Sequence, residues 1–182
     1  SMVLIEEGRL VAHDAGHPTF LQHKRKVTGR SLAMPTMAER LRDHGGAIIY
    51  ANVSPGAAYA HDPDGHGIVY HRVGSFGPGR VPVTDWDASR ITIDPVGDRY
   101  IADRFIADVV TGPRKPALAM MWLSEPDYSS HGYPLGSPEQ LRAVRESDAT
   151  AGLVFQAVAK ARAAGEDILL VVGSDHGHQT VG

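Results

Sequence analysis

The sequence predicts an α/β fold with a doubly wound, mostly parallel sheet. Three short apolar runs, at residues 47–53, 117–123 and 168–172, have the length and composition of buried parallel strands. A segment with helical features precedes each run, so helix and strand alternate along the chain. Polar residues directly follow the last two runs. Because ligands of open α/β sheets bind outside the carboxyl ends of the strands, we expect the functional site there.

The composition is that of a globular domain with a substantial core. Of the 182 residues, 42% are hydrophobic and 21% are charged, and the net charge of −3 argues against duplex nucleic acid as a partner. The chain has no cysteine, so any metal must be bound by histidine and carboxylate ligands. The longest apolar runs have about seven residues, where a membrane span needs roughly 20. The N-terminal residues lack the features of a signal peptide, so we expect no membrane span and favour the cytoplasm.

Before the first of these strands we expect three short features. Residues 3–5 predict a short strand, and Gly16-His17-Pro18 predicts a loop. A helix follows, because Thr36 and Glu39 have the spacing of a capping box and the glycines at 45–46 end it.

The middle of the chain contains a long segment of loop-like composition and then a helix. Residues 54–83 are rich in Gly, Pro, His and Asp, so we expect loops or a cap insertion there, with a short strand at 67–70. Such an insertion would shape substrate choice. The segment 99–110 carries an apolar row at i, i+4 and i+8, which predicts a helix: Ile101, Phe105 and Val109.

The last predicted helix has the clearest pattern. It begins at Pro138-Glu139 and ends before Gly165. Its expected apolar stripe consists of Leu141, Val144, Ala151, Val154, Phe155 and Val158. Asp148 falls on the same stripe, so we expect its carboxylate to be buried and bonded to the loops of the site.

Two Asp/His pairs follow the last two predicted strands. Asp127 and His131 are four residues apart, close enough to converge on one ion. Asp175 and His176 are adjacent, so both can bind one ion only where the backbone turns, which Gly177 permits. Each pair alone is weak evidence, because Asp and His are common in loops. Their positions after consecutive strands together favour a metal site.

The residues around these pairs carry a family resemblance. They are Trp122-Leu123-Ser124-Glu125-Pro126-Asp127 with His131, Ser137-Pro138-Glu139, Asp148, and Val172-Gly173-Ser174-Asp175-His176-Gly177. Together they resemble the type I phosphodiesterase/nucleotide pyrophosphatase family of the alkaline phosphatase superfamily. Stretches at 28–32, 35–41 and 56–58 resemble the middle of bacterial members, so the likeness covers residues 28–182.

The resemblance implies an alkaline phosphatase-like fold and a site with two divalent ions, zinc being expected. Asp127 and His131 would bind one ion, and Asp175 and His176 would bind the other. In the family, a Thr or Ser activated by the second ion attacks phosphorus, and water then hydrolyses the covalent intermediate.

The sequence departs from the family pattern at both ends. Another metal-binding Asp and the Thr or Ser nucleophile would lie upstream of Ser1, and a further His ligand would lie beyond Gly182. We therefore expect residues 1–182 to be one incomplete part of the catalytic domain. An unpaired sheet edge would then favour a homo-oligomer.

Several other residues have two plausible roles. His178 is expected to touch substrate phosphate, or to face solvent. Glu125 would either orient a ligand histidine or lie on the surface. Thr28 and Ser54 are weak candidates for a nucleophile inside the chain, because most loop hydroxyls form turns or caps. A further group has metal-binding residue types within a loop: His61, Asp62, Asp64 and His66.

The sequence thus predicts a metal-dependent hydrolase of phosphoric diesters or nucleotide pyrophosphates, whose partner is a small phosphate ester or nucleotide. A phosphonate hydrolase similar to phosphonoacetate hydrolase would use the same metal scheme. A metal-binding fragment without catalytic activity is the alternative outside the enzymes.

Overall fold

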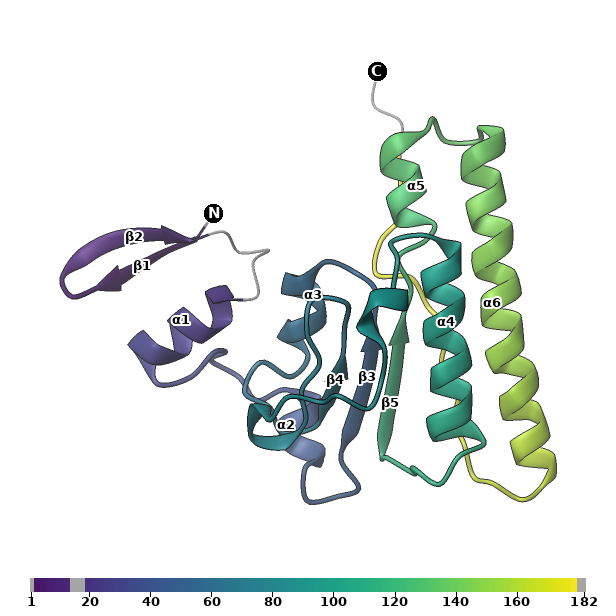
Figure 1. The fold of residues 1–182 in the computed structure, drawn as a ribbon, viewed down its shortest axis with the longest axis horizontal. Helices are drawn as coiled ribbons and strands as arrows, with labels where there is room; N and C mark the ends of the chain where they lie inside the picture. The colour runs from purple at the N-terminus through teal and green to yellow at the C-terminus, as the bar shows by residue number, and fades with distance from the viewer. Residues whose placement is uncertain (1, 14–18, 180–182) are drawn as a thin grey trace. The chain divides into compact units, whose positions relative to one another are not determined.

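The computed structural model describes residues 2–13 and 19–179 as a mixed α/β protein (Figure 1). Its backbone divides into two compact units. The first unit comprises Ser1–Ala88 and Pro116–Trp122, and the second comprises Ser89–Lys115 and Leu123–Gly182.

The first unit is organised by a three-stranded parallel sheet. Its strands are β3 (Ala47–Ala51), β4 (Ile68–Tyr70) and β5 (Leu118–Trp122), in the order β4-β3-β5. Ile49 pairs with Val69 on one side and with Met120 on the other. Every residue of the central strand β3 is buried, which explains its continuous apolar run. The structure therefore confirms the strands predicted within 47–53 and 117–123.

Three helices and a hairpin complete the first unit. The helices are α1 (Thr19–Thr28), α2 (Met37–Leu41) and α3 (Pro55–Ala60), and the hairpin pairs β1 (Met2–Glu6) with β2 (Arg9–His13). The hydroxyl of Thr36 accepts a hydrogen bond from the Glu39 N–H at 3.2 Å, which confirms the expected start of α2. The strand expected at 3–5 lies within β1, whereas the loop expected at 16–18 lies outside the described residues.

The segment 54–83 contains regular structure as well as loops. It holds α3, a 3₁₀ turn at Pro78–Arg80 and the strand β4, which was expected at 67–70. Val69 of β4 is fully buried in a core cluster with Ile49 and Tyr59. This part of the segment therefore contributes to the sheet and its core.

The second unit is built mainly from helices. They are α4 (Pro95–Phe105), a π-helical turn (Ile106–Val110), α5 (Asp127–Gly132) and α6 (Pro138–Ala163); a 3₁₀ turn at Ala88–Arg90 precedes them. The helix expected at 99–110 is confirmed and begins four residues earlier. Asp94 caps it by accepting a hydrogen bond from the Gly97 N–H at 2.9 Å. The apolar row on this segment is buried as expected: Ile101, Phe105 and Val109.

Helix α6 forms where it was expected but buries a different face. It packs beside α4 (Figure 1) and also contacts α5, with Ala143, Thr150, Val154 and Val158 buried. The prediction was wrong for Leu141, Val144 and Phe155, which are exposed. Asp148 is also exposed, so its expected burial was wrong too. The face of α6 that packs against α4 is therefore set by how the two helices pack, and the apolar stripe in the sequence does not specify it.

The strand expected at 168–172 does not form. Residues 164–179 contain no strand, and the side chains of Leu169, Val171 and Val172 are exposed. The Ile168 carbonyl accepts a hydrogen bond from the Arg162 Nε–H at 2.7 Å instead of from a neighbouring strand. A β-strand needs a backbone partner, and an apolar run does not supply one. Among the described residues, the parallel sheet therefore has three strands.

No helix in the described part of the chain combines the length and apolar character needed to span a bilayer.

Candidate metal centre

A buried carboxylate on α4 positions the loop that follows β5. Asp98 is 2% exposed. Its Oδ1 accepts hydrogen bonds from Ser124 N–H at 2.8 Å and from the Ser124 hydroxyl at 3.1 Å, and its Oδ2 accepts one from Glu125 N–H at 2.9 Å. These bonds satisfy two backbone donors that would otherwise be buried without partners. Asp98 therefore fixes the segment that leads into α5.

The next carboxylate stabilises the start of α5. Glu125 is buried, and its side chain accepts hydrogen bonds from Ser129 N–H at 3.0 Å and from the Ser129 hydroxyl at 2.9 Å. It is therefore no surface carboxylate, and these contacts go to a helix turn, not to a ligand histidine. Asp98 therefore holds the loop before α5, and Glu125 holds the first turn of α5.

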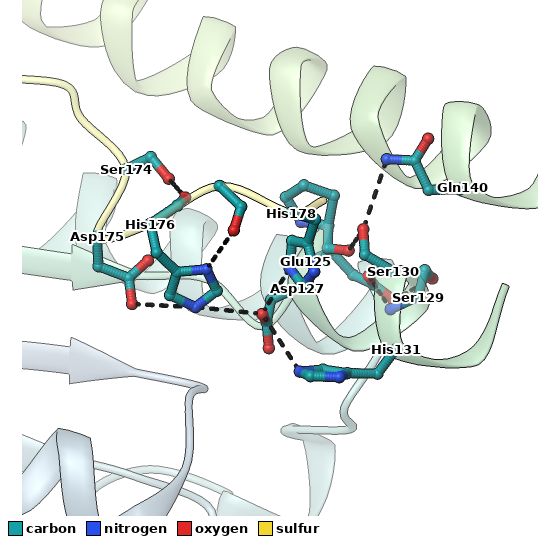
Figure 2. Close-up of polar contacts among 12 residues, drawn as sticks. Glu125, Asp127, Ser129, Ser130, His131, Gln140, Ser174, Asp175, His176 and His178 are labelled. Atoms are coloured by element: carbon teal, nitrogen blue, oxygen red, sulfur yellow. Dashed lines mark hydrogen bonds and ion pairs between the residues drawn. The ribbon is translucent and has the colours of Figure 1, made fainter. Parts of the chain in front are cut away.

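One oxygen of Asp127 is the focus of the cluster (Figure 2). The Nε2 atoms of three histidines surround Asp127 Oδ1: His131 at 3.6 Å, His176 at 3.4 Å and His178 at 2.9 Å. Asp127 and His131 are an i, i+4 pair on α5, so they lie on the same face of that helix. The structure thus brings residues from both Asp/His motifs to one point within the second unit.

The segment after residue 172 turns so that His176 faces this point. The Ser174 hydroxyl donates to the His176 carbonyl, and His176 Nδ1–H donates to the Gly177 carbonyl at 3.1 Å. Because this second bond places the proton of the neutral imidazole on Nδ1, the lone pair of Nε2 is available to bind a metal ion. The Gly177 carbonyl, followed by the carboxylates of Asp175 and Asp127, raises the pKa of His176 above its usual value. Asp175 lies at the edge of the cluster, with Oδ2 at 3.7 Å from His176 Nε2.

The donor atoms suit a zinc-type ion. One ligand atom from each of Asp127, His176 and His178 lies within 4.8 Å of the other two, and in the described part of the chain this is the only such group of three. A tetrahedral ion with bonds of about 2.0–2.1 Å places its ligand atoms about 3.3 Å apart, close to the distances around Asp127 Oδ1. A mixed set of imidazole and carboxylate ligands is what zinc accepts without cysteine. All three residues are exposed, so solvent and a substrate can reach the site.

In the segment 61–66, which also contains metal-binding residue types, the two carboxylates hold a loop in place. Asp62 is fully buried and accepts hydrogen bonds from the backbone N–H groups of His66 and Gly67, both at 2.8 Å. Asp64 pairs with Arg25 Nε at 3.3 Å. Both carboxylates therefore have structural partners within the first unit.

The two hydroxyl groups weighed as nucleophiles lie in the first unit. The Thr28 hydroxyl donates to the carbonyl oxygen of Lys24 (2.8 Å) or Arg30 (2.7 Å), so it closes the end of α1. Ser54 occupies the N-cap position of α3 without a capping hydrogen bond from its side chain. Neither the hydrogen bonds of Thr28 nor the position of Ser54 identifies a nucleophile.

The positioning role of Asp98 was missed in the sequence. A signal for it existed, because Asp98 precedes Ile101 by three residues and Phe105 by seven, which places it on the buried face of the helix. A carboxylate on such a face requires hydrogen-bond donors, and the nearby loop supplies them.

Comparison with known proteins identifies a family for most of the chain. The family model described as type I phosphodiesterase / nucleotide pyrophosphatase matches residues 16–182. The match includes every residue of the Asp/His cluster. No curated protein and no solved structure matches the chain.

Proposed function

Because the chain belongs to the type I phosphodiesterase / nucleotide pyrophosphatase family, we propose that it acts in the metal-dependent hydrolysis of phosphoric diesters or nucleotide pyrophosphates. The observation that carries this proposal is the convergence of His131, His176 and His178 on Asp127 Oδ1. A purely structural cluster would not need three imidazoles at one exposed carboxylate oxygen.

In this proposal the cluster is the metal centre of an alkaline phosphatase-like catalytic domain. Asp127 and His131 serve one ion, and Asp175 and His176 serve the other, with zinc as the expected metal. When bound there, two such ions would polarise the phosphoryl group and stabilise the charge on the attacking and leaving oxygens.

The chain's own residues prepare this centre. Asp98 and Glu125 hold the loop and first turn from which Asp127 projects. The Gly177 carbonyl orients the imidazole of His176 and leaves its Nε2 facing Asp127. The side chains of Asp127 and His176 are 49% and 52% exposed, so a phosphate ester can approach without any unfolding.

The test is hydrolysis of bis-p-nitrophenyl phosphate by the full-length protein, after removal of metal and after addition of zinc. We expect turnover only with zinc, and its loss in Asp127→Ala. Asp43→Ala is the matched control, because it removes a carboxylate of the first unit that is 78% exposed and pairs with its neighbour Arg42. Turnover that needs neither zinc nor Asp127 would contradict the proposal.

A substrate panel separates the related activities. Nucleotide pyrophosphates and diesters release their products through P–O cleavage, whereas phosphonoacetate releases phosphate only if the C–P bond breaks. Phosphonoacetate cleavage without diester cleavage would replace the proposed reaction with phosphonate hydrolysis. Zinc binding without turnover on any of these substrates would favour the metal-binding fragment.

A further inference from the structure

We propose that the second unit has a separate binding site between α4 and α6, which takes a small molecule that joins an anionic group to an apolar body. The two helices lie side by side (Figure 1), and the cavity between them has a volume of about 620 Å³. Cavities of roughly 300–1,000 Å³ are typical of small-molecule sites. The residues that line this one all belong to the second unit, and none is part of the Asp/His cluster. The inference therefore stands apart from the proposed hydrolysis.

An arginine without an acidic partner provides the positive charge of this site. The guanidinium carbon of Arg90 lies 4.3 Å from the centroid of the Tyr100 ring, and both residues line the cavity. Within the described residues, no carboxylate pairs with Arg90 and no oxygen accepts a hydrogen bond from its side chain. A guanidinium has five N–H donors in one plane, and a carboxylate or phosphate can accept two of them at once. Arg90 is thus oriented by an aromatic ring and available to an anion.

The two carboxylates that line the cavity already have cationic partners. Asp103 Oδ1 lies 2.9 Å from Arg99 Nε, and Glu146 Oε1 lies 4.0 Å from Arg142 Nε. Each is an i, i+4 pair within one helix, so each acid has an arginine beside it. The charge at the cavity that lacks a counterion is therefore that of Arg90, which favours an anionic ligand over a cationic one.

The walls of the cavity provide apolar surface for the rest of the ligand. Pro95 and Val96 contribute it from the first turn of α4, and Ala149 contributes it from α6. The side chain of Val96 is 73% exposed, so a ligand that covers it removes apolar area from water. An ion such as free phosphate or acetate would leave this surface uncovered. The combination of apolar walls with one unpaired guanidinium fits an amphipathic anion.

A buried hydroxyl on α6 provides a second point of recognition. Thr150 lines the cavity and is 6% exposed, and its hydroxyl makes no hydrogen bond in the part of the chain that the structure describes. Most buried hydroxyl groups have a hydrogen-bond partner, and a polar atom of a ligand in the cavity would supply one. Thr150 lies on α6 whereas Arg90 precedes α4, so one ligand would contact both sides of the cavity.

The experiment measures the fluorescence anisotropy of 2-naphthoate, an apolar carboxylate, as the full-length protein is added. We expect saturable binding. Arg90→Ala should weaken it at least about tenfold, because the loss of a hydrogen bond to a charged group lowers affinity about 10- to 100-fold. Arg145→Ala is the matched control, since it removes an exposed arginine of α6 that does not line the cavity.

A second variant tests the buried hydroxyl without opening a cavity in the core. Thr150→Val keeps a side chain of similar shape, and it should weaken 2-naphthoate binding about 2- to 10-fold, the effect of one neutral hydrogen bond. The temperature of thermal unfolding should not fall, because the hydroxyl has no partner among the described residues. A lower unfolding temperature with unchanged binding would show that the hydroxyl serves the fold, and would count against its role in the site.

The outcomes separate this site from the metal centre. Asp127→Ala should bind 2-naphthoate as the original protein does, and Arg90→Ala should hydrolyse bis-p-nitrophenyl phosphate at the original rate. Loss of 2-naphthoate binding in Asp127→Ala would place the probe at the metal centre and overturn the inference. Absence of binding, or equal binding by Arg90→Ala, would also overturn it and would leave the proposed function untouched.

Competition experiments identify the kind of anion. Displacement of 2-naphthoate by octanoate would assign the site to carboxylates with aliphatic chains, and displacement by AMP would assign it to nucleotides. Either result upholds the inference, provided that the displaced binding depends on Arg90. Displacement by acetate or inorganic phosphate at the same concentrations would overturn it, because these anions have no apolar body.

Discussion

His71 in the first unit and His176 in the second follow apolar segments of sequence, but their surroundings are opposite. His71 is fully buried, its Nε2–H donates to the Val53 carbonyl at 3.0 Å, and its Nδ1 accepts from the Val73 N–H at 3.1 Å. Burial lowers the pKa of His71 to about 4. The side chain of His176 is 52% exposed, and the Gly177 carbonyl and nearby carboxylates raise its pKa.

The difference shows how the environment assigns a histidine to structure or to chemistry. Both ring nitrogens of His71 are occupied by backbone groups, and desolvation keeps the ring neutral. His176 has one nitrogen held by the backbone and the other directed at Asp127. Residue type and position after an apolar run do not distinguish the two cases.

The sharpest test of this comparison replaces each histidine by alanine. His176→Ala should reduce zinc affinity at least about tenfold and change the free energy of unfolding by less than about 0.5 kcal/mol. His71→Ala should cost about 3 kcal/mol, because it leaves a cavity at a fully buried position and removes the acceptor of the Val73 N–H. Zinc calorimetry and urea unfolding measure the two effects. The comparison fails if both variants lose zinc binding and stability to the same extent.

Asp98 offers a test of how stability and site are connected within the second unit. Asp98→Ala removes the acceptor of three donors on Ser124 and Glu125, so we expect a loss of about 2–3 kcal/mol in unfolding free energy. Zinc affinity should fall with it, because the loop before Asp127 is released. Asp103→Ala, on the same helix but 56% exposed, should cost less than about 1 kcal/mol. Equal losses for the two variants in thermal unfolding would show that Asp98 has no special positioning role.

The free energy of unfolding should depend on pH because the pKa of His71 differs between the folded and unfolded chain. In the unfolded chain this imidazole binds a proton near pH 6.5, but in the folded chain it does so only near pH 4. Between these values the unfolded state binds more protons, so stability is full above pH 6.5 and falls as the pH decreases toward 4. The loss at pH 5 should be about 2 kcal/mol, from 1.36 kcal/mol for each pKa unit.

Urea unfolding at pH 7 and pH 5 measures this loss, and His71→Asn is the comparison because asparagine does not titrate. The pH dependence of the variant should be smaller by the same amount. A variant with the pH dependence of the original chain would assign the effect to other groups.

Much of the fold could be predicted because its signals are local. The apolar runs at β3 and β5, the capping pair Thr36 and Glu39, and the apolar row on α4 with the turn after it each act within a few residues. Propensity, capping and periodicity are physical properties of short segments. The family resemblance was likewise carried by short motifs, and the match over residues 16–182 confirms it.

The failures concern burial and pairing. The run at 168–172 has the composition of a strand but no backbone partner, and the face of α6 with Leu141, Val144 and Phe155 has the pattern of a core face but is exposed. Glu125 resembles a surface carboxylate in sequence and is buried as the acceptor for Ser129. Whether these residues pair or become buried depends on which other segment of the chain packs against them.

The sequence by itself determined the residue types of the site, the local elements that carry them and the family. Only the tertiary structure decided that three histidines approach one oxygen of Asp127, namely His131, His176 and His178. It also decided that Asp98 holds the loop before α5 and that His71 is fully buried. The physical reason is the range of the forces involved. Helix and strand formation depend on neighbours along the chain, whereas burial, ligand convergence and pKa depend on neighbours in space.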